Sequence, residues 1–349
     1  MVDATPRQPQ VKRSEGEVAV NGVDGGDSLR ADVMAIALAE GRMVGGAGHA
    51  RARVYLECRL GEIGLTPYRG GDFERAYRNI RAGVESWNLV AIVPGTDRRL
   101  PPVLIGAHYD SIIAAPSADD NAAAVAIALS AAEALKRTPR ARDVVIALFD
   151  AEEPPYFLSP DMGSVRFCED QADARGFHAA IIMDLVGHDF ALPLPGLANL
   201  LVATGIESSG ALPALVDACP RPPQLPLVLV HDDVVGDMSD HHAFRLRDVP
   251  YLFLSCGRWA HYHMETDTPD RLAWGKMAMI RDYVVSLAGA LADADLAVAP
   301  VDTTATEIRY LEAALGASLP MVLATLQMSS LKTRADLQRL AMGLQAMGV

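Results

Sequence analysis

The stretch 144-VVIALFDAEE-153 joins a strongly apolar run to a cluster of acids. Residues 144–149 are apolar without alternation, which is typical of a strand covered on both faces in a parallel sheet. Asp150, Glu152 and Glu153 follow at once. In open α/β sheets the ligand crevice lies beyond the carboxyl ends of the strands. Acids at this position are therefore either solvated loop residues or part of a site, and the rest of the chain has to decide.

The neighbouring sequence predicts a strand–helix–strand unit around this stretch. Residues 102–107, PVLIGA, predict one strand, and 122–137, AAAVAIALSAAEALKR, predict the helix that leads to the strand at 144–149. Such a unit implies a parallel sheet and an α/β fold. Further strands are predicted at 88–93, 179–187, 225–230 and 249–255, and helices at 29–43 and 48–61.

The domain organisation is simple, because no internal repeat or low-complexity linker interrupts the pattern. We expect one compact domain over residues 29–300, preceded by a polar, Gly-rich and mobile tail over 1–28. Residues 301–349 are expected to form a helical extension that packs on the body or on a partner subunit. Four apolar residues recur there at helical spacing: Leu337, Leu340, Leu344 and Met347.

Composition and charge exclude several classes of protein. The net charge of -13 argues against a nucleic-acid partner. Four cysteines without a CxxC pair argue against a Cys-rich zinc site and a disulfide framework. No segment approaches 18 uninterrupted apolar residues, so no membrane span is predicted. The first residues contain no apolar signal-peptide core, and we therefore expect a cytoplasmic protein.

Five segments place His, Asp or Glu at a strand end or at a helix start. These residues are His108 and Asp110, Asp119 and Asp120, Glu152 and Glu153, Asp184, and His261 and His263. Taken singly, most have ordinary explanations, such as a hydrogen-bonded loop residue or a helix N-cap. Asp184 does not, because it interrupts an apolar segment and buried carboxylates are rare unless paired or bound to metal.

Imidazole and carboxylate ligands without thiolate suit a hydrolytic site for zinc or a related divalent ion. The set exceeds what one catalytic zinc requires, which indicates a two-metal site with a bridging carboxylate. Asp110 is placed to accept the second ring N–H of His108, as ligating histidines usually require. Asp119 and Asp120 compete for the bridge, and His261 competes with His263 as ligand.

Several motifs together resemble the zinc aminopeptidases of metallopeptidase family 28, from about residue 30 to 290. They are GAHYDS (106–111), PSADDNAAAVA (116–126), FDAEE (149–153), IIMDLVG (181–187), SDHHAF (239–244) and HYHMETDTPDRL (261–272). The resemblance implies a three-layer α/β sandwich, with a central mixed, mostly parallel sheet flanked by helices, as in zinc exopeptidases. It also implies two divalent metal ions, most simply Zn²⁺.

The resemblance assigns a role to each site residue. His108 and Asp184 would bind one metal ion, Glu153 and His263 the other, and Asp120 would bridge them. Glu152 would be the general base and Tyr262 would stabilise the oxyanion, with Asp240 and His241 in support. The family pattern favours Asp120 over Asp119, which is left as a possible helix cap. The distance to the Asp267-Thr268 pair favours His263 over His261.

The resemblance predicts an exopeptidase that removes the N-terminal residue from a peptide or aminoacyl substrate with a free N-terminus, as a possible homo-oligomer. One departure is the segment PPYFLSPDM (154–162), which separates Glu153 from Gly163. Glutaminyl cyclases of the same fold carry a longer insertion there, so a glutaminyl-peptide cyclotransferase is the alternative. A non-catalytic receptor-like module is a remote third possibility.

The two prolines of this segment, Pro154 and Pro155, have a fixed φ and no backbone N–H. We expect them to turn the chain sharply out of the sheet. Tyr156 or Phe157 would then contact the substrate side chain, unless the loop packs its aromatic rings on the body.

Overall fold

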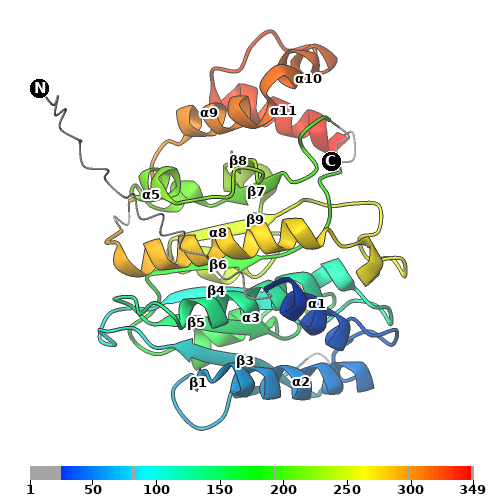
Figure 1. Cartoon of the computed structure of the whole chain (residues 1–349), viewed down its shortest axis with the longest axis vertical. Coiled ribbons are helices and arrows are strands. Elements are labelled where there is room, and N and C mark those ends of the chain that lie inside the picture. The colour runs from blue at the N-terminus through cyan, green and yellow to red at the C-terminus, as the bar shows by residue number, and fades with distance from the viewer. Residues whose placement is uncertain (1–24, 81–82, 192–193, 297–298, 347–349) are drawn as a thin grey trace, which may run out of the picture.

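The computed structural model describes residues 25–80, 83–191, 194–296 and 299–346. Within these ranges nine strands form one sheet in the order β1-β3-β5-β4-β6-β9-β7-β8, with β2 paired to β3. In Figure 1 the strands of this sheet follow one another along the long axis of the molecule, which is vertical. The strands are β1 Thr66–Pro67, β2 Glu74–Arg78, β3 Glu85–Val93, β4 Val103–His108, β5 Val144–Phe149, β6 Ala179–Met183, β7 Leu201–Thr204, β8 Leu227–Val230 and β9 Tyr251–Ser255.

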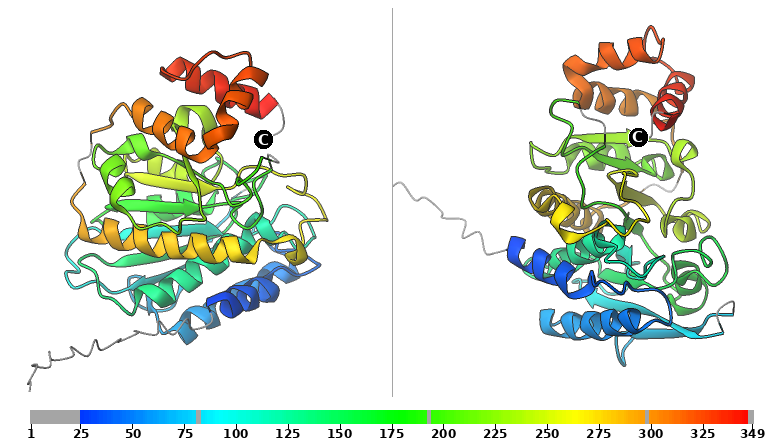
Figure 2. Two further views of the ribbon diagram at one scale, coloured as in Figure 1. Left: turned by 45° about the horizontal axis from the view of Figure 1, so that its top comes forward. Right: turned by 90° about the vertical axis from the view of Figure 1, so that its right-hand side faces the viewer.

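Helices lie on both sides of the sheet, as the right-hand view of Figure 2 shows, which confirms the predicted α/β architecture. The described α-helices are α1 Gly25–Ile36, α2 Ala47–Ile63, α3 Ala123–Leu135, α4 Gly163–Arg166, α5 Leu212–Ala218, α6 Asp232–Val235, α7 His241–Arg245, α8 Trp274–Asp293, α9 Thr304–Leu315, α10 Leu319–Thr325 and α11 Arg334–Ala346.

The centre of the sheet consists of β5, β4, β6 and β9, and these strands are all parallel. Antiparallel pairs occur on both flanks, where β3 pairs with β5 and β7 pairs with β9. The predicted mixed sheet is therefore confirmed, with parallel pairs at its centre and between β7 and β8 at one edge. Four neighbouring strands consequently end at the same edge of the sheet.

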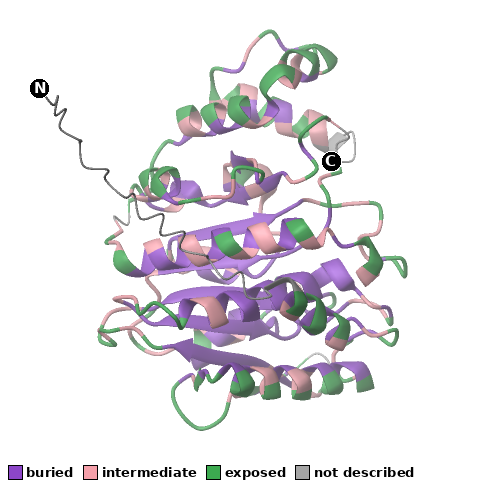
Figure 3. Cartoon of the chain, in the orientation of Figure 1, coloured by how far each residue is buried: buried purple, intermediate pink, exposed green. Residues whose placement is uncertain are grey.

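Helix α3 is buried almost all round, from Ala123 to Ala132. It packs against α1 and α8 as well as against β4. A helix that is apolar on all sides needs such an environment, and its many alanines allow close approach. The strand–helix–strand unit that the sequence predicts is the centre of the larger hydrophobic core. Figure 3 shows that the central strands are almost entirely buried.

A second core covers the opposite face of the sheet. Its aromatic rings include Phe149 of β5, Phe167 and Phe244, with ring centroids 5.7 and 6.3 Å from that of Phe149. This core lies under the short helices α4 and α7. The residues that follow β5 must therefore pass over a packed aromatic layer.

The C-terminal helices pack on the β8 edge of the sheet. Val228 of β8, Leu311 of α9 and Leu340 of α11 belong to one buried apolar cluster. Glu307 of α9 is buried and makes two 2.7 Å contacts with Arg334 of α11, which ties the two helices together. Of the predicted apolar stripe, Leu337 and Leu340 are buried and Leu344 packs against the cluster, while Met347 lies outside the described residues.

Several predicted boundaries were wrong. Helix α1 begins at Gly25 and ends at Ile36, not near Met43. The chain turns at Gly41, which has φ +65° and whose Cβ would lie 2.3 Å from the carbonyl oxygen of Ile113. Strands β1, β2 and β7 were not predicted, because β1 and β7 are short and β2 is largely polar. The expected mobile tail lies outside the described residues up to position 24.

Each helix in the described part of the chain is either too short or too polar to cross a lipid bilayer.

Gly163 opens α4 directly beside the end of β5, and its N–H donates to the carbonyl oxygen of Asp150 at 2.9 Å. A Cβ at this position would lie 2.0 Å from that oxygen. We predict that Gly163→Ala destabilises the protein by ~1–3 kcal/mol, because backbone has to move. Gly275→Ala in α8 is the matched control, since no atom lies within 4 Å of its added Cβ. Equal urea midpoints for the two variants would contradict this prediction.

Candidate metal centre

Four strand ends bring the predicted site residues together. His108 is the last residue of β4, Glu152 and Glu153 follow β5, and Asp184 follows β6. His263 lies in the loop after β9. Because these strands are neighbours and parallel, their carboxyl ends meet at one edge of the sheet. Asp120 joins them from the short segment Ala118–Ala122 that precedes α3.

Two groups of side chains could each hold a metal ion, and they share one residue. His108, Asp120 and Asp184 form the first group, and Asp120, Glu153 and His263 form the second. His108 Nε2 lies 3.4 Å from Asp120 Oδ1 and 3.6 Å from Asp184 Oδ1. His263 Nε2 lies 3.2 Å from both Asp120 Oδ2 and Glu153 Oε2. Each oxygen of Asp120 thus faces a different histidine.

Asp110 links the first histidine to the glutamate pair. Its Oδ1 lies 3.3 Å from His108 Nδ1. The same carboxylate accepts the backbone N–H groups of Glu152 and Glu153 at 3.0 and 3.1 Å. One buried side chain therefore positions both the imidazole and the turn that carries the two glutamates.

Asp267 has the same function for the segment that carries Asp120. Its two carboxylate oxygens accept the backbone N–H groups of Asp119 and Asp120 at 2.9 and 3.1 Å. The sequence analysis used Asp267 only to choose between two histidines and assigned it no role. Its position in the HYHMETDTPDRL motif was the available signal.

Asp119 does not cap the helix, contrary to the suggestion from the sequence. Its Oδ1 accepts the N–H of Gly187 at 2.6 Å, and its Oδ2 lies 2.7 Å from His188 Nδ1. The His188 ring stacks on Trp259, with centroids 4.6 Å apart. Asp119 therefore ties the Asp120 segment to the chain that follows Asp184.

The loop after β9 directs its three ring residues differently. His261 Nδ1 lies 2.7 Å from Thr266 Oγ1, so it contacts its own loop, whereas His263 faces Asp120 and Glu153. Tyr262 stacks on His263 with centroids 3.7 Å apart, and the Arg258 guanidinium lies 5.0 Å from the Tyr262 ring. The structure thus places Tyr262 over the edge of the cluster.

Left-handed backbone is concentrated around these residues. Of the eight described non-glycine residues with positive φ, four lie here: Ser117, Ala151, Leu185 and His263, with φ values of 44°, 52°, 53° and 58°. Each is itself a member of the cluster or lies within three residues of one. Such conformations are costly, typically ~1–3 kcal/mol each, and persist only where the surroundings impose them. At Ala151, this conformation precedes the two glutamates whose N–H groups both reach Asp110.

Asp240 and His241, both from the SDHHAF motif, differ in their surroundings. Asp240 is fully buried, and burial raises its pKa to about 7 against the opposing effect of His108. His241 faces away, with its Nε2 3.6 Å from Asp232 Oδ1 and its ring stacked on Phe253. Only Asp240 therefore adds to the charge of the cluster.

The pKa shifts show how strongly the carboxylates crowd one another. Burial, with Asp120 nearby, raises the pKa of Glu153 to about 8. Burial also raises the pKa of Glu152 well above its usual range, although His108 opposes this. The pKa of Asp120 is lowered despite its burial, because it contacts both histidines. Burial would lower the pKa of His108, but Glu152 and Asp184 outweigh it and raise the value.

The donor atoms fit a bound cation. Among the described residues, His108 Nε2 makes no hydrogen bond, and the same holds for Glu152 Oε1, Glu153 Oε1 and Asp184 Oδ1. Buried polar atoms are rarely left in this state without an ion or water. Divalent cations would neutralise the crowded carboxylates and occupy these free lone pairs.

Arg42 supports the backbone next to the cluster, and the sequence analysis did not identify it. Its guanidinium is fully buried and donates to the carbonyl oxygens of Tyr109, Pro116 and Ser117 at 2.7, 2.7 and 2.9 Å. Its side chain thereby connects the end of β4 to the segment before Asp120. A charged residue in an otherwise apolar and Gly-rich stretch was the available signal.

The 154–162 segment leaves the sheet through consecutive turns, in which Tyr156 N–H donates to Glu153 O and Ser159 N–H donates to Tyr156 O. Phe157 packs against the second hydrophobic core, and Tyr156 is largely buried. Phe157 thus follows the alternative in which the loop packs its rings on the body. Contact of Tyr156 with a substrate stays a prediction.

Comparison with known proteins identifies relatives with this architecture. The chain is 28% identical over 215 residues to the uncharacterized protein YfbL of Escherichia coli, a match that covers 54% of this chain and 66% of YfbL. The matched part therefore spans just under two thirds of that relative.

Two of the solved structures that share the fold illustrate the likeness. A Zn-dependent exopeptidase from Parabacteroides distasonis matches with a TM-score of 0.61 and 17% identity, covering 76% of this chain and 97% of that one. The glutaminyl cyclase of Tannerella forsythia matches with a TM-score of 0.60 and 17% identity, covering 75% and 97%. The sequence model of peptidase family M28 matches residues 88–288, which carry every candidate metal ligand. The chain therefore belongs to this family.

Proposed function

We propose that this chain is a dinuclear metal-dependent aminopeptidase. The observation that carries the proposal is the position of Asp120, whose two oxygens each face a histidine of a different ligand group. His108, Asp120 and Asp184 would hold one ion, and Asp120, Glu153 and His263 the other. Imidazole and carboxylate donors without thiolate suit Zn²⁺ at a hydrolytic site.

When bound, the two ions would lower the pKa of a water molecule and polarise the scissile carbonyl. Glu152 would take the proton from the attacking water. It is almost fully buried, and its Oε2 lies 3.9 Å from His108 Nε2. Burial raises its pKa, which makes it a stronger base toward the attacking water, and the same carboxyl can return the proton to the leaving amine.

The Tyr262 hydroxyl would donate a hydrogen bond to the developing oxyanion. Its pKa is raised by burial and by the Asp120 carboxylate, so the phenol stays protonated and can donate. The stack of Tyr262 on His263 holds the ring beside the ligand group.

A glutaminyl cyclotransferase is the second candidate, favoured by the insertion after Glu153 and by the likeness to the Tannerella forsythia cyclase fold. The two reactions differ in chemistry. Hydrolysis consumes water and releases an amino acid, whereas cyclisation lets the α-amine attack the side-chain amide of an N-terminal Gln and releases ammonia.

A substrate panel separates these reactions. We expect the protein, with Zn²⁺ supplied, to release the aniline from several aminoacyl anilides and to release no ammonia from Gln-peptides above the uncatalysed rate. A chelator should abolish the hydrolysis, and added Zn²⁺ should restore it. Ammonia release without anilide hydrolysis would favour the cyclase, and neither reaction would favour a non-catalytic module.

The adjacent glutamates should respond differently to the same substitution. Glu152→Gln preserves shape and removes the base, so turnover should fall ~10²–10⁴-fold. Its metal content, measured by elemental analysis, should stay near that of the parent protein. Glu153→Gln removes a ligand and should lose both metal and activity. The opposite pattern of metal loss would show that the two roles are reversed.

Asp267 should influence metal binding without being a ligand. Asp267→Asn can accept only one of the two N–H groups that hold Asp119 and Asp120. We predict a ~10–100-fold loss of metal affinity, measured by competition with a chelator, as is usual for residues that orient ligands. Asp270→Asn, exposed three residues further on, is the matched control and should bind metal like the parent. Equal affinities for both variants would refute the role of Asp267.

A further inference from the structure

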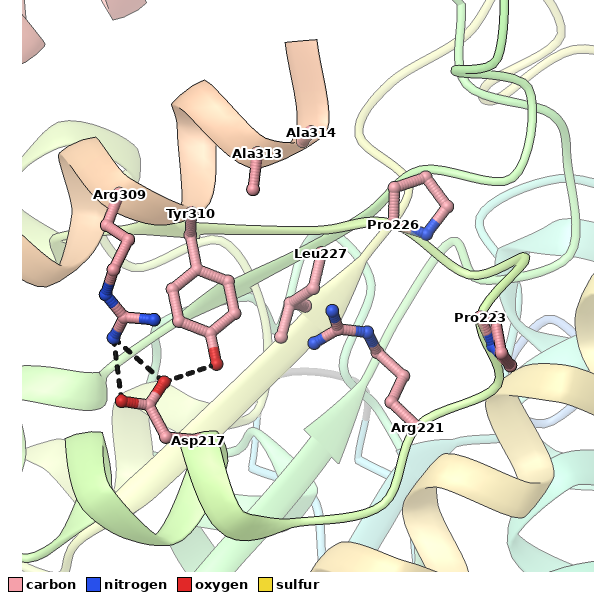
Figure 4. Close-up of a pocket in the computed structure, with 9 residues that line it drawn as sticks. All are labelled: Asp217, Arg221, Pro223, Pro226, Leu227, Arg309, Tyr310, Ala313 and Ala314. Atoms are coloured by element: carbon pink, nitrogen blue, oxygen red, sulfur yellow. Dashed lines mark hydrogen bonds and ion pairs between the residues drawn. The ribbon is translucent and has the colours of Figure 1, made fainter. Parts of the chain in front are cut away.

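A second concave site lies at the opposite margin of the molecule from β1, where α9 covers the beginning of β8. Figure 4 shows this pocket between α9 and the chain that joins α5 to β8. Its volume is about 510 Å³, within the ~300–1,000 Å³ typical of ligand sites. None of its lining residues belongs to the candidate metal centre.

The charges in this pocket do not balance. Asp217 accepts from Arg309 Nη2 at 2.9 and 2.7 Å and from the Tyr310 hydroxyl at 2.7 Å. This carboxylate is therefore already paired with the arginine of α9. Arg221 is the second guanidinium of the pocket, and it leaves one positive charge in excess on a protein whose net charge is -13.

Among the described residues, no ion pair joins Arg221 to a carboxylate, and its side chain lies instead beside two tyrosine rings. Its guanidinium carbon lies 6.0 Å from the centroid of Tyr283 and 5.8 Å from that of Tyr310. Figure 4 shows the guanidinium directed into the space beside Leu227. Arginine forms a planar fork of N–H donors that matches a carboxylate, and here those donors face the pocket.

The other walls are apolar. Leu227 is almost fully buried and forms the floor, with Pro226 and Ala314 beside it. A bare inorganic anion would leave these surfaces wet, whereas a molecule with both an anionic and an apolar part would cover them. The chemistry of the lining thus favours an organic carboxylate over phosphate or sulfate.

We propose that this pocket binds a small carboxylate with an apolar side chain, such as a free hydrophobic amino acid or the C-terminal residue of a peptide. The carboxylate would pair with Arg221, and the apolar part would lie on Leu227 and Pro226. One wall comes from α9, which lies beyond the family segment ending at residue 288. The site therefore depends on the C-terminal helices of this chain and is independent of the function proposed above.

Calorimetric titration of the full chain with N-acetyl-L-leucine tests this inference, because the blocked amine prevents binding as an aminopeptidase substrate. We expect saturable binding of this acid, and none of the neutral N-acetyl-L-leucinamide. N-acetyl-Ala-Ala-Leu distinguishes the two sources. Its binding would extend the ligand class to peptide C-termini, and its failure to bind would restrict the class to single amino acids.

Arg221→Gln should weaken binding of N-acetyl-L-leucine roughly 10–100-fold, as expected for loss of a charge-assisted pair. Arg137→Gln, at an exposed arginine after α3, is the matched control and should bind like the parent. Ala313→Phe keeps both arginines and fills the pocket, so it should abolish binding with an unchanged Tm. It decides the matter if Arg221→Gln does not fold.

Four results would overturn the proposal. They are the absence of saturable binding to the parent protein, equal binding of the acid and its amide, equal binding of inorganic phosphate, and undiminished binding in a folded Arg221→Gln or Ala313→Phe variant.

Discussion

Asp120 is buried between His108 and His263, and much of the surrounding structure holds it in that position. A carboxylate this deeply buried is stable only when positive or hydrogen-bonding groups surround it. Glu152, Glu153 and Asp184 lie close by and increase the negative charge. The cluster therefore depends on precise backbone support, and bound cations would offset the repulsion that raises the pKa of its glutamates.

The backbone support comes from side chains that contact main-chain groups and not one another. Asp110 holds the turn of the two glutamates, Asp267 holds the Asp119–Asp120 segment, and Arg42 binds carbonyl groups on both sides. Hydrogen bonds to charged groups are stronger than neutral ones, so few residues suffice to fix these loops. The candidate metal ligands and the residues that hold their backbone in place are therefore different residues.

The C-terminal helices add a layer of a different kind. They cover the β8 edge of the sheet, which would otherwise present unpaired strand groups, and Glu307 with Arg334 locks α9 to α11. The pocket between α9 and the chain that leads into β8 contains Arg221, which forms no ion pair among the described residues. A feature outside the matched family segment can thus create a binding surface without altering the central site.

The α/β class, the strand–helix–strand unit and the kinds of residue at the strand ends can all be predicted from the amino-acid sequence alone. This was possible because apolar runs of 144–149 and 102–107 are local patterns, and because acids and histidines at strand ends mark a shared edge. The choice of Asp120 and His263 over their neighbours came from the family resemblance and not from local pattern, since adjacent residues look equivalent in sequence.

The contacts of the remaining polar residues become visible only in the folded chain. Asp119 binds Gly187 and His188 instead of capping a helix, and Asp267 reaches a segment 147 residues away. The roles of Arg42 and Arg221 likewise could not be predicted from the sequence. They depend on the carbonyl groups, rings or open space that each guanidinium faces in the folded chain. Local sequence carries propensity and periodicity, whereas the partner of a buried charge is set by the packing of distant segments.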